Sequence, residues 1–250
     1  MAELLRSPAL SALAGIRHGF TGRRGGASTG PLASLNLARR PGERFETLGA
    51  NWATALEALG SPGPLALVNQ VHGAAVLEVS DGAGPLSVMG DADALLTRAA
   101  GVALAVRVAD CVPVLLAVPA SGTREAAVAA VHAGWRGTAA HIVEAAVDAI
   151  CEASGATPEE LVAAIGPAIG PCCYEVSQEV ADAVGQPDAP RSPRDRPMVD
   201  LRAANAAQLR SRGVVTVDVV GPCTRCSPDH YSHRGDGSAT GRQAALIVIR

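Results

Sequence analysis

The spacing of hydrophobic and polar residues predicts helices and strands that alternate along the chain. Between residues 43 and 59, apolar side chains recur at helical spacing with charged residues on the opposite side, which predicts an amphipathic helix. Short apolar runs at 65–71, 74–79 and 92–97, bounded by Gly, Pro, Asp and Ser, predict strands. The longest apolar run, 101–119, predicts one or two strands in the core.

The second half of the chain continues this alternation. Thr138, Thr157 and Asp200 each stand where a helix can begin, because their side-chain oxygens can accept hydrogen bonds from the first free backbone N–H groups. Apolar runs at 214–220 and 244–249 predict the closing strands. We therefore expect an α+β fold.

The chain lacks the signs of several domains. Its 250 residues are 48% hydrophobic, which is enough to bury a substantial core, and no repeat or low-complexity linker divides them. The Pro- and Arg-rich stretch 185–198 predicts a flexible loop. We expect a single domain over residues 1–250, with a loosely ordered N-terminus at 1–17.

Charge and composition exclude some classes of function. The formal charge is −3 with the cations scattered, and only 2% of residues are aromatic, so we expect no binding to nucleic acid. Arg107, Asp110 and Pro113 interrupt the longest apolar run, which argues against a membrane span. The first residues lack the pattern of a signal peptide. These features predict a cytoplasmic protein without membrane contact, and we expect a monomer.

Six cysteines are too few for a disulfide scaffold in a chain of this length. In a reducing compartment they are better candidates for reactive or metal-bound thiols.

Three residues in different segments combine into a candidate metal site. His72, Cys111 and His132 each lie near a strand end, beside a bend with Gly or Pro. Two imidazoles and a thiolate suit zinc, and three ligands leave a fourth position for water or substrate. The alternative is a buried thiol beside two histidines that bond to backbone groups. Asp110, a carboxylate in a core strand, needs a partner; next to a metal ligand it could orient that ligand or move protons.

A second group of potential ligands is local in sequence. Cys223, Cys226, His230 and His233 place four of them within eleven residues, but their spacing matches no standard zinc finger. We interpret this segment as a polar loop around the entrance of the site.

Two features point to an anion. Backbone amides of the glycine-rich stretch 21–31 could hold one, helped by Arg23 and Arg24. Arg136 stands just before a predicted helix N-terminus, where negative charge is favoured. Phosphate fits this pattern; the alternative for Arg136 is a surface charge on a tight turn.

Eight sequence blocks in one order carry a resemblance to a known family. They are "HGFTGRRGGASTGPLASLNL", "NQVHG", "DADALLT", "GVALAVRVADCVPVLLA", "AAVHAGWRGT", "AIGPAIGPCCYEV", "DLRAANAAQL" and "SHRGDGSATGRQAALIVI". From about His18 to the C-terminus, the chain strongly resembles the YfiH/LACC1 family, long called multicopper polyphenol oxidase and now described as purine nucleoside phosphorylase.

The resemblance implies a central mixed β-sandwich flanked by helices and a metal site made by His72, Cys111 and His132. The implied metal is zinc, with copper as the alternative. The implied activities are phosphorolysis of adenosine, inosine, guanosine and methylthioadenosine, and deamination of adenosine, so that purine nucleosides and phosphate would be the partners.

Within this framework we assign roles to further residues. Cys111 and Asp110 are the catalytic candidates, with Asp110 as the proton shuttle of deamination. Arg23 and Arg136 are candidate clamps for phosphate. Asn69, Gln70 and Tyr174 complete the expected substrate-binding set.

Two departures and three alternatives accompany the resemblance. This chain has "FTGR" where the family more usually has "FSTR", which leaves Arg23 in register but puts a glycine before it. The family usually has a second basic residue where "SHRGDG" has Gly235. A laccase-type copper oxidase needs more imidazoles than the six histidines here, and His141 is expected to face solvent. A cysteine hydrolase would use Cys111 as nucleophile and His132 as base, with an acid to orient it. A non-enzymatic, zinc-stabilised interaction module is the third alternative.

Overall fold

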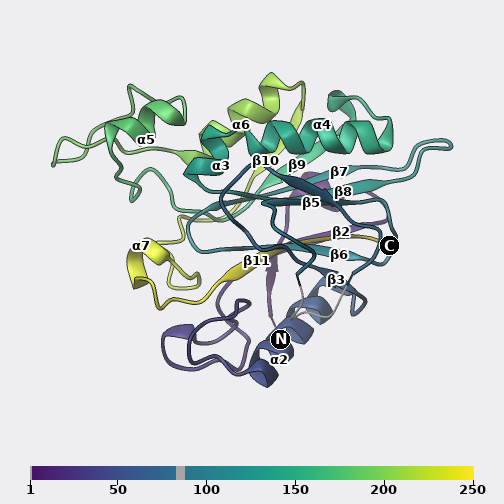
Figure 1. Cartoon of the computed structure of the whole chain (residues 1–250), viewed down its shortest axis with the longest axis horizontal. Helices are drawn as coiled ribbons and strands as arrows, with labels where there is room; N and C mark the ends of the chain where they lie inside the picture. The colour runs from purple at the N-terminus through teal and green to yellow at the C-terminus, as the bar shows by residue number, and fades with distance from the viewer. Residues whose placement is uncertain (1, 83–87) are drawn as a thin grey trace.

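The computed structural model describes residues 2–82 and 88–250, whose strands form two mixed sheets packed face to face (Figure 1). The five-stranded sheet has the order β1 (Leu4–Leu5), β2 (Ile16–Thr21), β11 (Gln243–Ile249), β6 (Ala103–Val108), β3 (Leu65–Ala66). The six-stranded sheet has the order β10 (Thr216–Val219), β9 (Val162–Ile165), β7 (Val112–Val118), β8 (Ala127–Ala133), β5 (Ala94–Thr97), β4 (Val76–Glu78). Neighbouring strands are antiparallel except in the pairs β3–β6, β4–β5 and β9–β10.

Helices cover the outer faces of the two sheets (Figure 1). The amphipathic helix α2 (Phe45–Leu59) lies on the five-stranded sheet, and α4 (Ile142–Ser154) with α6 (Leu201–Ser211) on the six-stranded sheet. Shorter helices are α1 (Pro8–Ser11), α3 (Trp135–Ala139), α5 (Gln178–Ala183) and α7 (His233–Asp236), with 3-10 turns at Gly30–Leu32 and Pro158–Glu160. The predicted single α+β domain, a β-sandwich flanked by helices, is confirmed.

The core has three layers, one between the sheets and one under each helical cover. Strands β7 and β8 are buried on both faces, with alternate residues facing the other sheet and the helices. This double burial explains the long apolar run at 101–119, since strands covered on both sides need no polar alternation. The run forms β6 and β7, joined by a turn at 109–111 that carries Asp110 and Cys111.

Two of the three predicted helix caps are confirmed. The Asp200 carboxylate accepts hydrogen bonds from the first backbone N–H groups of α6, and Thr157 forms a capping box with Glu160 at a 3-10 turn. The third prediction is wrong. Thr138 lies inside α3, where its hydroxyl accepts a hydrogen bond from Asn205 in α6 (3.0 Å), and α4 begins only at Ile142.

The first residues of the chain contribute β1 and α1. Ser7 caps α1 and its hydroxyl bonds to Asp218 of β10 (2.5 Å), while Leu10 is fully buried. Loose order at residues 1–17 stays a prediction. Among the described helices, none combines the length and the apolar character needed to cross a bilayer.

Candidate metal centre and arginine-lined cavity

His72, Cys111 and His132 meet at one end of the sandwich. Cys111 lies in the turn between β6 and β7, His132 in β8, and His72 in the loop after β3. Their potential ligand atoms all lie within 4.8 Å of one another, and the two imidazole rings pack edge to face with centroids 4.9 Å apart. The structure thus brings together the three residues that the sequence singled out.

The backbone around this triad has unusual conformations. His72 and Asp110 have φ angles of 63° and 86°, in the left-handed region that side chains other than glycine rarely adopt. Gly134 follows β8 next to the triad, and a Cβ there would lie 3.1 Å from both the Cys111 Sγ and the His72 ring. Close approach of the backbone therefore requires glycine at position 134.

The buried carboxylate of Asp93 organises the triad, and the sequence analysis did not identify it. Asp93 is fully buried, and its Oδ1 lies 2.7 Å from His132 Nδ1. Its oxygens also accept hydrogen bonds from three successive backbone N–H groups, at Val71 (3.2 Å), His72 (3.0 Å) and Gly73 (2.6 Å). One side chain thus fixes both the ring of His132 and the strained loop at His72. The sequence signal that could have identified Asp93 is its position in the block "DADALLT", directly before the buried strand β5.

The charges in this cluster stabilise one another. Burial raises the pKa of Cys111, but the charge of His132 and hydrogen bonds from both histidines outweigh it and lower this pKa to about 6. For His132, burial lowers the pKa, but Cys111 and Asp93 outweigh it and raise the value to about 9. The hydrogen bonds from His132 and the loop amides likewise lower the pKa of Asp93 against the effect of burial. The thiolate is therefore the favoured form of Cys111.

This donor set fits a zinc ion. Two imidazoles and one thiolate are ligands that zinc prefers, and three protein ligands are typical of sites that keep a position open. When the Nδ1–H group of His132 donates a hydrogen bond to Asp93, Nε2 of the neutral ring is left free to bind a metal.

Asp110 lies next to Cys111 in a polar cradle. Its Oδ1 accepts a hydrogen bond from the Thr224 hydroxyl (2.6 Å), and its Oδ2 accepts one from the backbone N–H of Arg234 (2.6 Å). The side chain lines the same cavity as the triad. These two donors give Asp110 the partners that a carboxylate in the core requires.

The triad opens into a cavity of about 550 Å³ that is rich in arginine. Four of the residues predicted to bind substrate or phosphate line it, namely Asn69, Gln70, Arg136 and Tyr174. Five further arginines that the sequence analysis did not assign to the site also line it: Arg39, Arg40, Arg107, Arg234 and Arg242. Asp110 is the only carboxylate among the described residues of the lining. A cavity with this charge favours an anionic ligand.

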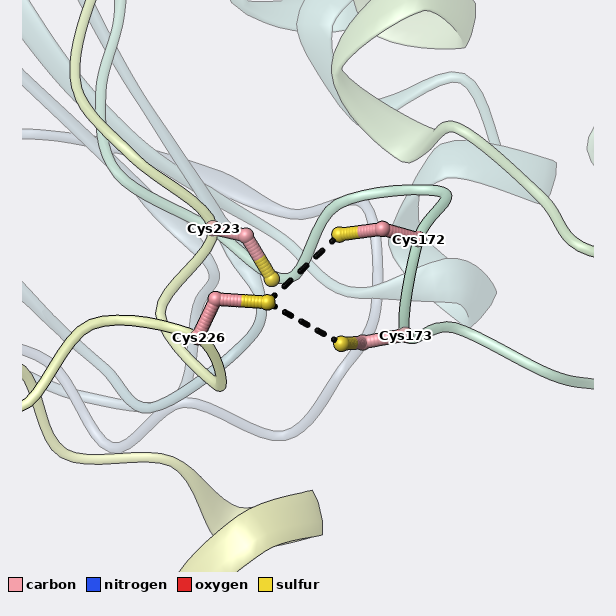
Figure 2. Close-up of side chains that lie close together, drawn as sticks. All are labelled: Cys172, Cys173, Cys223 and Cys226. Atoms are coloured by element: carbon pink, nitrogen blue, oxygen red, sulfur yellow. Dashed lines mark hydrogen bonds between the residues drawn. The ribbon is translucent and has the colours of Figure 1, made fainter.

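The four potential ligands near residue 230 do not form one site. Cys223 and Cys226 instead face Cys172 and Cys173, which lie about fifty residues earlier in the chain (Figure 2). His230 bonds through Nδ1 to the Ser227 hydroxyl (2.9 Å), whereas His233 lines the cavity. The segment is thus a loop beside the cavity, as expected, and its two cysteines have partners that the sequence analysis did not identify.

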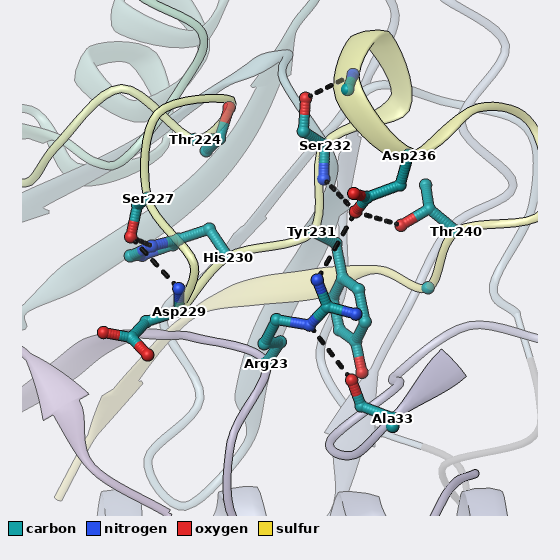
Figure 3. Close-up of polar contacts among 12 residues, drawn as sticks. Arg23, Ala33, Thr224, Ser227, Asp229, His230, Tyr231, Ser232, Asp236 and Thr240 are labelled. Carbon is teal, nitrogen blue, oxygen red and sulfur yellow. Dashed lines mark hydrogen bonds and ion pairs between the residues drawn. The ribbon is translucent and has the colours of Figure 1, made fainter. Parts of the chain in front are cut away.

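Arg23 is not among the residues that line the cavity. Its guanidinium donates to the Ala33 carbonyl (3.0 Å), lies 3.5 Å from Asp236, and stacks on the Tyr231 ring (Figure 3). Its role in binding phosphate stays a prediction.

Part of the glycine-rich loop uses its backbone amides to hold its own shape. The N–H groups of Gly26, Ala27 and Ser28 donate to Ser34 or Asn51, and that of Arg23 donates to the Asp229 carbonyl. Binding of an anion by the other amides of residues 21–31 stays a prediction.

The fold and the site define a class of protein, in which a two-sheet sandwich holds a His/Cys/His group in an arginine-lined cavity. Comparison with known proteins gives the family. The sequence model of the family described as "Multi-copper polyphenol oxidoreductase laccase" matches residues 17–250, so the chain belongs to this family.

Full-length relatives carry a different name. A purine nucleoside phosphorylase of Streptomyces coelicolor is 41% identical over 94% of this chain and 96% of its own length. One from Deinococcus radiodurans is 38% identical over 98% of this chain and 92% of its own. The crystal structure of YlmD from Geobacillus stearothermophilus, at 35% identity, superposes with a TM-score of 0.88 over 99% of this chain and 96% of that one.

Proposed function

We propose that this protein is a zinc-dependent purine nucleoside phosphorylase that also deaminates adenosine. The observation that carries the proposal is the cavity, where the donor set of His72, Cys111 and His132 lies among six arginines. Full-length relatives named purine nucleoside phosphorylase support the same reaction class. The proposed substrates are adenosine, inosine, guanosine and methylthioadenosine, with phosphate as the second substrate.

In phosphorolysis, a phosphate oxygen forms a bond to C1′ of the ribose while the bond from C1′ to the purine nitrogen breaks. The purine leaves with the electron pair and takes up a proton, and the other product is ribose 1-phosphate. Guanidinium groups can hold the phosphate and orient it toward C1′. Arg136 is suited to this role, since it lines the cavity with its guanidinium 4.3 Å from the Trp135 ring centre and has no ion pair among the described residues.

In deamination, water adds to C6 of adenosine, and ammonia leaves to give inosine. A bound zinc ion would supply Lewis acidity to this site. Asp110 is the proposed proton shuttle, because its carboxylate lines the cavity beside Cys111 and is held by Thr224 and Arg234. Each carboxylate oxygen retains a second lone pair that can receive a proton.

Product analysis tests the proposal. Zinc-loaded protein is incubated with adenosine, with and without phosphate, beside a Cys111→Ala variant. Cys151→Ala is the matched control, because Cys151 is a half-buried thiol on α4 outside the cavity lining. We expect phosphate-dependent adenine and ribose 1-phosphate, and phosphate-independent inosine, both lost only in Cys111→Ala. A folded, zinc-loaded protein that forms neither product contradicts the proposal.

A cysteine hydrolase is the second candidate, because Cys111, His132 and Asp93 have the order of a nucleophile, a base and an orienting acid. The two candidates differ in how the thiol reacts. A metal-bound Cys111 is protected from iodoacetamide until zinc is removed, whereas a free catalytic thiol reacts at once.

A multicopper oxidase does not fit the described residues. His18 accepts a hydrogen bond from the Ser7 backbone, and the exposed His141 bonds to Glu144. His230 bonds to the Ser227 hydroxyl, and the three imidazoles that remain at the cavity, those of His72, His132 and His233, are too few for mononuclear and trinuclear copper together. Oxidation by a single copper ion in the triad is tested by assaying a polyphenol with copper-loaded protein.

A further inference from the structure

Four cysteine side chains from two distant segments converge on one point (Figure 2). Cys172 and Cys173 lie in the turn after β9, and Cys223 and Cys226 in the loop after β10. Their sulfur atoms all lie within 4.8 Å of one another. The Cys226 Sγ is 3.7 Å from that of Cys172 and 3.3 Å from that of Cys173.

Backbone N–H groups hold Cys223 and its turn in place. The Gly170 N–H donates a hydrogen bond to the Cys223 Sγ (3.2 Å). The Cys-x-x-Cys turn is closed by hydrogen bonds from the Cys226 and Ser227 N–H groups to the Cys223 carbonyl. Hydrogen bonds of this kind orient metal ligands from the outside.

The packing beside the cluster is tight at Gly170. A Cβ at Gly170 would lie 3.2 Å from Cys223 Cβ and 3.4 Å from Cys172 Sγ. Glycine at this position lets the two cysteine-bearing segments approach each other.

We propose that Cys172, Cys173, Cys223 and Cys226 bind a structural zinc ion. Zinc–sulfur bonds of about 2.3 Å in a tetrahedron place neighbouring sulfurs about 3.8 Å apart, close to the separations seen here. Four thiolates complete the coordination shell, so the site has no open position for substrate. This centre is separate from the His/Cys/His triad and uses none of its residues.

A zinc ion bound by the four cysteines would also fix part of the wall of the arginine-lined cavity. Thr224 lies inside the Cys-x-x-Cys turn and donates its hydroxyl hydrogen bond to Asp110, and Tyr174, directly after Cys173, lines the cavity. An ion that links the two segments therefore holds both residues in place. Its loss is expected to loosen the cradle of Asp110 without removing a ligand of the triad.

Zinc content is measured in chains purified under reducing conditions. The Cys111→Ala background removes a ligand of the triad, and we expect it to retain one zinc ion per chain. Adding Cys172→Ser and Cys226→Ser should abolish this zinc, whereas adding Cys151→Ser, the matched control, should not. A Cys111→Ala protein that contains no zinc after incubation with the metal overturns the proposal.

Cobalt titration of the wild-type chain and of Cys111→Ala is a second measurement, which does not require the cysteine-to-serine variants to fold. We expect strong sulfur-to-cobalt charge-transfer absorption, with most of it retained in Cys111→Ala. A spectrum that disappears in Cys111→Ala overturns the proposal. An intact mass two hydrogens below the reduced value, with no bound metal, shows a disulfide in the cluster and also overturns it.

Discussion

Replacing Asp93 by asparagine tests the organisation of the triad with almost no change in shape. Oδ1 of Asp93 accepts from His132 Nδ1 and the His72 N–H, and Oδ2 accepts from the Gly73 and Val71 N–H groups. An asparagine has one oxygen and one NH₂ group. In either orientation of the amide, its NH₂ group faces two hydrogen-bond donors.

The two orientations have different costs. With NH₂ toward the loop, two buried N–H groups lose their acceptor, which costs about 1–3 kcal/mol. With NH₂ toward His132, the ring must accept at Nδ1 and carry its proton on Nε2, the nitrogen needed for the metal. We expect Asp93→Asn to lower the zinc affinity of the triad by about 10–100-fold. We also expect it to lower the free energy of unfolding of the metal-free chain by about 1–3 kcal/mol.

The assay is zinc titration against a competing chelator, together with denaturant unfolding of the metal-free chain. Asp188→Asn is the control, since this carboxylate is exposed and does not line the cavity. Both variants retain every cysteine and histidine, so a difference between their titrations reports the triad. If Asp93→Asn binds zinc within about twofold of the control and unfolds at the same denaturant concentration, Asp93 does not orient His132, and the reasoning is refuted.

Four other predictions concern single positions. Burial, and then the charge of a neighbouring arginine, lower the pKa of His18 to about 4, so the unfolded chain binds a proton near pH 6.5 that the folded chain does not. Stability should therefore fall from pH 6.5 to 4, and His18→Gln should flatten this fall in denaturant titrations by no more than about 3 kcal/mol. A Cβ at Gly166 would overlap the Phe20 ring, so Gly166→Ala should lower the free energy of unfolding by about 1–3 kcal/mol. Gly49→Ala, with open space in α2, should instead raise it by about 0.5–1 kcal/mol. Arg136→Ala should raise the KM for phosphate by about 10–100-fold, and an unchanged KM removes Arg136 from the phosphate site.

Local features of the sequence were sufficient for much of the fold. The helix at 45–59 and the Asp200 cap follow from side-chain spacing and from free N–H groups within one turn. The Thr138 cap failed because a tertiary partner, Asn205, takes its hydroxyl. Capping propensity describes a segment in isolation, whereas Thr138 is buried in α3 against α6.

The sequence indicated the candidate metal ligands and several of the residues that line the cavity, but not Asp93 or most of the arginines. His72, Cys111 and His132 are unusual residues at the ends of apolar runs, and their blocks resemble one family. Asp93 looks like an ordinary residue at the start of a strand until β5 and β8 pair and place its carboxylate against His132. The arginines of the cavity come from several separate segments, so no local pattern marks them.

The sequence by itself determined the class of fold and most helix and strand positions, because hydrophobic periodicity and capping act locally. It also named the three candidate ligands of the triad, through residue type and the resemblance to one family. Only the tertiary structure decided that Cys223 and Cys226 face Cys172 and Cys173 rather than His230 and His233. The physical reason is the parallel pairing of β9 with β10, which brings the loops that follow these two strands together. Contacts between segments about fifty residues apart depend on strand pairing and core packing, which spacing within one segment does not encode.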